Sequence, residues 1–372
     1  MNRFMLRRLS AVMLSLLLAS CSDDSASPVQ TEAAPDTLSA DSRPVSCDAN
    51  ADISYMCGIT NGEDILQIGG TPWVLVSGMD GSLTGGDING RLHLVNSTDH
   101  SFEVLFPGSN PVFRQDESLF SGCPGPLDSN HFSAHGLALR KIDKGPELYH
   151  LYMTSHGARE AIEVFEVDAF LKPTIKWVGC IPMPESSWTN SVTILSDGGF
   201  MATQFYNPAL HTIEDVFNGV DTGHIFEWHP GQDVTVLEGT QGAGPNGIVI
   251  SDDQRFVFMS AFGTGEVVRF DRSSTPPERE AVQVGIYPDN IRWTDQGKLY
   301  AAGSNTPDYC GTDSCEAGWS VVEITPYNLA MNRVGGAGED AALHDASSAL
   351  PVGDEIWVGT FSGDRIAILP RP

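Results

Sequence analysis

The sequence predicts an all-β protein and, more narrowly, a six-bladed β-propeller with four-stranded antiparallel blades. Short runs of β-branched and aromatic residues, bounded by Gly, Asp, Asn and Pro, recur through the chain, whereas helical periodicity is nearly absent. A run of four or five mostly apolar residues that ends on a small or polar one occurs six times, at intervals of 42 to 78 residues. A propeller blade repeats about every 40 to 50 residues, so six such buried inner strands indicate six blades.

The apolar runs share a simple arrangement with the residues before them. They are WVLVSG (73–78), LYMTSH (151–156), FMATQF (200–205), VFMSAF (257–262), LYAAGS (299–304) and IWVGTF (356–361). Upstream of each run lies a second strand-like element, and turns such as SDGG, SDDQ and TDQG separate the two. We therefore expect each blade to contain a strand, a hairpin turn and a strand.

The start of the chain reads as a bacterial lipoprotein signal. Three arginines precede an apolar run, and the small residues Leu18-Ala19-Ser20 stand directly before Cys21. This pattern predicts a signal peptide over residues 1–20, acylation of Cys21, a disordered tether over residues 21–45 and a propeller over residues 46–372. Ser22 after the acylated cysteine favours the outer membrane of a bacterial cell envelope, to which the lipid would anchor the protein.

Composition and motifs exclude several function classes. The net charge of −27 becomes −30 once the signal is removed, and such a field argues against nucleic acid as a partner. No G-x-G-x-x-G stands before a predicted helix and no G-x-x-x-x-G-K-[ST] occurs, so we expect no nucleotide. The absence of G-x-S-x-G argues against a serine nucleophile.

Seven cysteines are an odd number, but lipidation of Cys21 would leave six for disulfides in an oxidising compartment. The six allow fifteen pairings, and the sequence does not decide among them. Cys310 with Cys315 could close a tight local loop, and Cys47 with Cys57 could fix the entry to the first strand. The others are Cys123 and Cys180.

Each upstream strand-like element begins with a pair of residues of which at least one is polar. We call this pair a polar token. The six tokens are Glu63-Asp64, His135-Gly136, Asn190-Ser191, Asn246-Gly247, Asp289-Asn290 and Ser347-Ser348. Equivalent positions in successive blades form a ring around the propeller axis, so the tokens should converge. We expect no Lys or Arg beside the tokens, and carboxylate and amide oxygens crowded in this way would be costly unless a cation lies between them. Hard oxygen ligands in this number suit Ca²⁺ better than zinc.

Asn246 could be interpreted either as a residue of a hairpin turn or as a metal ligand. Asn-Gly in GPNGIVISDD is a strong hairpin signal. We place the turn instead at Asp252-Asp253 and start a strand at Asn246. Gly247 is then interpreted as room for the backbone beside a metal.

With these motifs in order, the chain resembles the paraoxonase/arylesterase family of calcium-dependent six-bladed propellers. The resemblance rests on GITNGEDILQI, HFSAHGLAL, LYHLYMTSHGAREAIEVFEV, PNGIVISDDQRFVFMSAF, DNIRW and DASSALPVGDEIWVGTF, and it covers residues from about 57 to 368. The family belongs to a wider group that includes gluconolactonases and strictosidine-synthase-like propellers.

The resemblance implies a catalytic calcium and a histidine pair. By motif, the calcium ligands fall on Glu63, Asn190, Asn246, Asp289 and Asn290. The histidines proposed in the family to activate water match His135 and His156. A second, buried calcium of the family would use Asp64, but Ser191 stands where the family has Asp, which puts that second ion in doubt.

The function that follows is a calcium-dependent hydrolase of lactones or aryl esters, in which Ca²⁺ polarises the carbonyl and a histidine activates water. Asp289 is an alternative base, and His344 with Asp345 is a rival dyad. Phe205, Phe262 and Phe361, at or just beyond the ends of three apolar runs, are candidates to line the cavity mouth. A gluconolactonase-like sugar lactonase and a non-catalytic, calcium-stabilised binding propeller are the alternatives.

Overall fold

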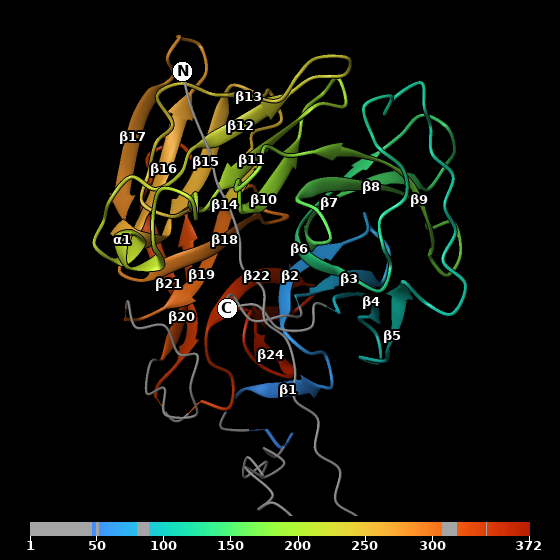
Figure 1. Ribbon diagram of the computed structural model, residues 1–372. Coiled ribbons are helices and arrows are strands. Elements are labelled where there is room, and N and C mark those ends of the chain that lie inside the picture. Colours follow the sequence, from blue (N-terminus) through green and yellow to red (C-terminus); the bar gives the residue numbers. More distant parts are fainter. Residues whose placement is uncertain (1–46, 50–51, 80–88, 307–317, 340) are drawn as a thin grey trace, which may run out of the picture. The chain divides into compact units, whose positions relative to one another are not determined.

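The computed structural model describes residues 47–49, 52–79, 89–306, 318–339 and 341–372. In these residues the chain forms six four-stranded antiparallel sheets (Figure 1), which confirms the predicted six-bladed β-propeller. Helical structure in the described part is limited to α1 (Ile213–Phe217) and the 3₁₀ turn η1 (Phe262–Thr264).

The first three blades follow one another along the chain. Blade 1 contains β2 (Gly62–Gln67), β3 (Trp73–Gly78), β4 (Arg91–Asn96) and β5 (Phe102–Phe106). Blade 2 contains β6 (Phe132–Lys141), β7 (Leu148–Gly157), β8 (Ala161–Asp168) and β9 (Thr174–Pro182). Blade 3 contains β10 (Thr189–Ile194), β11 (Phe200–Gln204), β12 (Ile225–Trp228) and β13 (Thr235–Val236).

The remaining blades include the closure of the ring. Blade 4 contains β14 (Pro245–Ile250), β15 (Phe256–Ala261), β16 (Glu266–Asp271) and β17 (Glu278–Gln283). Blade 5 contains β18 (Tyr287–Trp293), β19 (Leu299–Ser304), β20 (Trp319–Ile324) and β21 (Met331–Ala337). Blade 6 contains β22 (Ala346–Val352), β23 (Glu355–Thr360), β24 (Arg365–Pro370) and, as its outermost strand, β1 (Ser54–Cys57).

Because β1 pairs with β24, blade 6 takes strands from both ends of the propeller sequence. The first strands of the blades form a closed ring: β2 contacts β6, β6 contacts β10, β10 contacts β14, β14 contacts β18, β18 contacts β22, and β22 contacts β2. These six strands therefore surround the axis, and closure leaves no blade with an unprotected inner edge.

One assignment from the sequence was wrong. The six apolar runs coincide with β3, β7, β11, β15, β19 and β23, which are the second strands of the blades, not the innermost ones. The innermost strands carry the polar tokens. The physical reason is that a second strand packs both its faces against neighbouring blades and needs apolar residues throughout, whereas an innermost strand also faces the axis.

Disulfides settle part of the cysteine pairing. Cys47 is bonded to Cys57 at the start of the propeller, as the spacing suggested, and Cys123 is bonded to Cys180. Cys310 and Cys315 lie outside the described residues, as do the signal segment, Cys21 and the tether, so those assignments stay predictions. Among the described residues no helix is long and apolar enough to cross a membrane.

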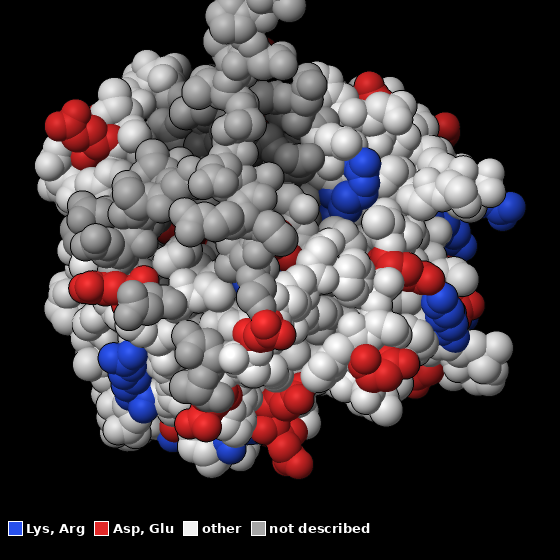
Figure 2. Space-filling view, turned by 90° about the horizontal axis from the view of Figure 1, so that it is seen from below, with Lys and Arg blue, Asp and Glu red and all other residues white. Residues whose placement is uncertain are grey.

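Charged side chains are scattered over the face of the molecule that Figure 2 shows. On that face the acidic and basic side chains of the described residues stand among uncharged ones, and no broad basic patch forms.

Candidate metal centre and histidine pair

All six polar tokens lie at a bulge in the innermost strand of a blade. In each blade the pairing of the first two strands shifts by one residue across the token, for example between Gly62 and Ile65 in blade 1 and between Pro245 and Ile248 in blade 4. The same shift occurs in the other four blades. A bulge leaves residues out of the ladder and redirects their side chains. The bulges thus turn polar side chains of all six blades away from the regular sheet pattern.

The five predicted calcium ligands each place an unsatisfied oxygen in the protein interior. Their side chains are at most 5% exposed. The oxygens without a hydrogen-bond partner are Oε2 of Glu63 and Oδ1 of Asn190, Asn246, Asp289 and Asn290. A buried acceptor left without a partner costs about 1–3 kcal/mol, so five together require an explanation such as a bound cation.

These residues meet at one small cavity of about 50 Å³. Glu63, Asn190, Asn246 and Asp289 line it together with His135. Asn290 lies next to this set, because its side-chain amide donates a hydrogen bond to Oε1 of Glu63. The structure therefore brings together all five side chains that the sequence predicted as ligands.

The electrostatics of these carboxylates favour a cation. Burial raises the pKa of Glu63 well above its usual value, and the charges of Asp64 and Asp289 raise it further. Burial likewise raises the pKa of Asp289 well above its usual value. Both carboxylates would stay ionised most readily beside a positive charge. In the described ranges no three or more His, Cys, Asp or Glu side chains form a metal-binding group on their own, and three of the five predicted ligands are asparagines.

Carboxylate and amide oxygens are the donor set that Ca²⁺ prefers, and thiolates or clustered imidazoles would be expected for zinc. The residues present therefore fit a calcium ion. They supply two negative charges, from Glu63 and Asp289.

Asp64 does not fit a second calcium, because its carboxylate is already satisfied. Arg292 on β18 pairs with it, with Nε 3.1 Å from Oδ1 and Nη2 in contact with Oδ2. Oδ2 also accepts the backbone N–H of Leu137, at 2.7 Å, and Oδ1 that of Ile65, at 2.9 Å. The expectation that no Lys or Arg lies beside the tokens was wrong: Arg292 follows Asn290 by two residues in DNIRW.

The interpretation of Gly247 also needs correction. A Cβ at this position would lie 2.4 Å from the backbone nitrogen of Ile291 and 2.6 Å from the Cα of Asn290. The glycine therefore makes room for the backbone of the neighbouring innermost strand, β18, and not for a metal. The predicted turn around Asp252-Asp253, between β14 and β15, is confirmed.

The two predicted histidines form a hydrogen-bonded pair beside the cavity. Nδ1 of His135 lies 2.9 Å from Nε2 of His156. Nε2 of His135 lies 3.6 Å from Oε1 of Glu63, which joins the pair to the metal cluster. Burial lowers the pKa of His135 well below its usual value, and His156 lowers it further, so its imidazole is neutral near pH 7.

Sequence reasoning missed two residues that contact the histidine pair. Oε1 of Glu160 lies 2.7 Å from Nδ1 of His156, and its only sequence signal is its position four residues after that histidine in SHGARE. The ring of Trp188 lies over that of His156, with 5.4 Å between centroids. Trp188 has a φ of 34°, a strained backbone conformation that is often kept at functional sites.

The rest of the cavity lining, which we call the rim, is apolar. Phe205, Phe262 and Phe361 line it, as the sequence suggested, and so do Met79, Trp188, Ile213 and Phe217. Neither His344 nor Asp345 is among the lining residues, although Asp345 is near enough to Asp289 to raise its pKa. His135 therefore lines the cavity, whereas neither residue of the rival dyad does.

Comparison of the sequence with protein-family models gives no match, and comparison with curated proteins gives none either. Solved structures with the same fold include a gluconolactonase from Xanthomonas campestris, which is 14% identical with a TM-score of 0.52 over 86% of this chain and 89% of its own. A luciferin-regenerating enzyme is 12% identical with a TM-score of 0.50, over 85% and 92%. A putative gluconolactonase is 15% identical with a TM-score of 0.50, over 87% and 93%. At these identities the likeness shows the six-bladed fold alone.

Proposed function

We propose that this protein is a calcium-dependent hydrolase of lactones or aryl esters, similar in its site to the paraoxonase/arylesterase family. The observation that carries the proposal is the cluster of five buried, unsatisfied oxygens, four of them on residues that line one cavity, beside a hydrogen-bonded histidine pair. The oxygens would hold Ca²⁺ through Glu63, Asn190, Asn246, Asp289 and Asn290. When bound, the ion would supply Lewis-acid polarisation of the substrate carbonyl.

The charge balance supports a divalent ion. Arg292 pairs with Asp64, and although its charge also lowers the pKa of Glu63, burial and the charges of Asp64 and Asp289 keep that pKa well above its usual value. Burying two ionised carboxylates without a counter-ion would be costly, and one divalent cation would offset both negative charges.

The histidines would act as the base. Neutral His135 lines the cavity and would accept a proton from water at Nε2, and His156 would hold its ring through Nδ1. Asp289 also lines the cavity, but as a calcium ligand it would be a weaker base. His135 is therefore the preferred general base.

The cavity rim bears on the substrate class. Five aromatic side chains, those of Trp188, Phe205, Phe217, Phe262 and Phe361, line the cavity together with the polar residues. A polyhydroxylated sugar lactone would bury hydroxyl groups against this rim without hydrogen-bond partners, whereas an alkyl or aryl group would bury favourably. The rim therefore favours an apolar lactone or aryl ester over the sugar lactones suggested by the names of the gluconolactonase neighbours.

The cellular setting stays a proposal of the same kind. Two disulfides in the described residues suit an oxidising compartment such as the bacterial envelope. The predicted lipid on Cys21 would anchor the protein there, with the membrane as partner through the anchor only.

A substrate panel tests the function. Purified protein would be assayed with alkyl-substituted lactones, gluconolactone and phenyl acetate, in calcium, after complete chelation, and after calcium is restored. The proposal predicts turnover of the apolar substrates that is lost on chelation and recovered with calcium. Turnover that survives complete metal removal would contradict the metal mechanism, and calcium binding without turnover of any substrate would favour the binding propeller.

A further inference from the structure

Glu160 occupies the turn that joins the second and third strands of blade 2, between Gly157 at the end of β7 and Ala161 at the start of β8. Its side chain points back along the turn to His156, with Oε1 2.7 Å from Nδ1. Its second oxygen, Oε2, accepts the backbone N–H of Thr189 at the start of β10, at 3.3 Å. The carboxylate is thus held at both oxygens, and one of them is directed at the histidine pair.

Hydrogen-bond chemistry then fixes where the protons lie in the pair. An ionised carboxylate only accepts hydrogen bonds, so Nδ1 of His156 must be the donor to Glu160. When the His156 ring carries this one proton, its other nitrogen, Nε2, is an acceptor, and its partner at 2.9 Å, Nδ1 of His135, is the donor. Nε2 of His135 is left with its lone pair, on the side that faces Glu63.

We propose that Glu160 is a positioning residue that sets the tautomers of both histidines and so presents Nε2 of His135 as the base. This inference rests on the proposed function, because it assigns a role within the same site. Glu160 touches neither the cavity nor the predicted metal ligands, and it acts only through His156.

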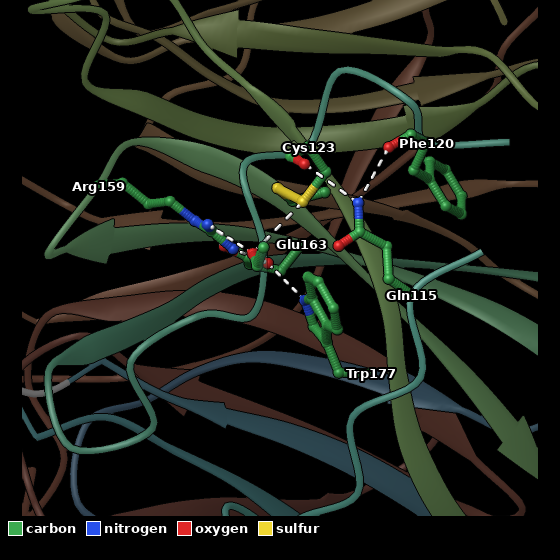
Figure 3. The surroundings of a disulfide bond; sticks show 8 residues. Gln115, Phe120, Cys123, Arg159, Glu163 and Trp177 are labelled. Carbon is green, nitrogen blue, oxygen red and sulfur yellow. Dashed lines mark hydrogen bonds and ion pairs between the residues drawn. A yellow bond between two sulfur atoms is a disulfide. The ribbon is translucent and has the colours of Figure 1, made fainter. Parts of the chain in front are cut away.

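The neighbouring residue shows why the turn can hold this orientation. Arg159 forms a two-pronged ion pair with buried Glu163, with N–O distances of 2.7 and 2.9 Å, and Trp177 donates to the same carboxylate at 2.7 Å. Figure 3 shows Arg159, Glu163 and Trp177 beside Cys123. Arg159 also donates to the carbonyl of Gly125, 2.9 Å away, in the segment that the Cys123–Cys180 disulfide fixes to β9.

Trp188 restrains the ring of His156 independently of Glu160. The ring of Trp188 lies against it, and the strained φ of Trp188 shows that the surrounding structure imposes this conformation. With one ring face covered and Nδ1 bound to Glu160, His156 has little freedom to reorient.

The test is Glu160→Gln, with Glu166→Gln as the matched control. Glutamine has the shape of glutamate, but its amide can donate as well as accept, so it no longer dictates the tautomer of His156. Glu166 lies on β8 in an ion pair with Lys176 and contacts neither histidine. Nitrogen-15 NMR of histidine-labelled protein reports the tautomers directly, and activity on the substrate panel, calcium content and thermal unfolding are measured on the same samples.

In the wild type and in Glu166→Gln, both His135 and His156 are expected to carry the proton on Nδ1. In Glu160→Gln the nitrogen-15 shifts of both rings should move toward the other tautomer, and kcat should fall about ten- to a hundredfold with KM within about twofold. Calcium content and the unfolding temperature should not change. Unchanged tautomers together with an unchanged kcat in Glu160→Gln would overturn the inference. If the wild type hydrolyses no substrate, the proposed function fails, and the NMR comparison still decides the role of Glu160.

Discussion

The guanidinium of Arg292 pairs with the carboxylate of Asp64 across the propeller axis and so joins blade 5 to blade 1. Arg292 also donates to the carbonyl of Leu137 in blade 2, at 2.9 Å. Asp64 is fully buried and Arg292 is 7% exposed, so the pair is almost completely removed from water. An internal cation thus stands at the carboxylate where the family resemblance would place a second calcium.

Removing the arginine should destabilise the fold. Arg292→Met leaves the carboxyl group of Asp64 buried without its counter-ion, and breaking a buried pair in this way costs about 3–5 kcal/mol. The double variant Asp64→Asn/Arg292→Met removes both charges and should recover much of that loss. Urea denaturation measures both. Equal stability of the single variant and the wild type would show that the pair is not an ion pair in solution.

Removing the proposed base should separate catalysis from metal binding. His135→Gln is expected to lower kcat by about 10²–10⁴, the usual contribution of a general base, while calcium content stays unchanged. His150→Gln is the matched control, because His150 lies on β7 beyond the cavity lining. Full activity of His135→Gln would assign the base to another residue, with Asp289 the next to test.

The aromatic rim should select substrates by size and polarity. Phe217, at the end of α1, lines the cavity, and its ring lies 5.9 Å from that of Phe262. Phe217→Ala should raise KM for aryl and long-chain substrates more than for small ones, because only the former would bury apolar area against the ring. An equal change in KM for all substrates would place the substrate elsewhere.

Acid should destabilise the protein partly through His93. Burial lowers the pKa of His93, on β4, to about 4. The histidine of an unfolded chain has a pKa of about 6.5, so between these two values the unfolded state binds the additional proton. Stability from this group is therefore complete above about pH 6.5 and is lost as the pH falls toward 4, by about 3 kcal/mol in all.

His93→Asn removes the titrating group. The free energy of unfolding of this variant, measured by denaturant at pH 7, 5.5 and 4, should decline less with acid than that of the wild type. Parallel declines would mean that His93 takes up its proton in the folded state.

The sequence predicted the ring of tokens well, because a propeller repeats one strand arrangement and equivalent positions must face the same axis. Glu63, Asn190, Asn246 and Asp289 could therefore be placed together although 226 residues separate the first from the last. The bulges that aim them were not visible in the sequence, since they depend on the pairing of each innermost strand with its neighbour.

Contacts between residues far apart in the sequence were harder to predict. Arg292 lies 228 residues from Asp64, and nothing in DNIRW shows that its side chain crosses the axis. Glu160 depends on how the turn after β7 folds back, and Cys123 with Cys180 was one of many pairings. Which strand of a blade is innermost was also misjudged, because the more apolar strand is the one buried on both faces.

The central claim, a calcium ion held by the axial tokens, is tested most directly by calorimetric titration of metal-free protein with Ca²⁺. Asn246→Ala removes one proposed ligand, and Asn328→Ala, at an exposed loop position, serves as its control. The account predicts one calcium per chain in the wild type and in the control, and much weaker binding in Asn246→Ala. Failure of the wild type to bind calcium, or undiminished binding by Asn246→Ala, would contradict it.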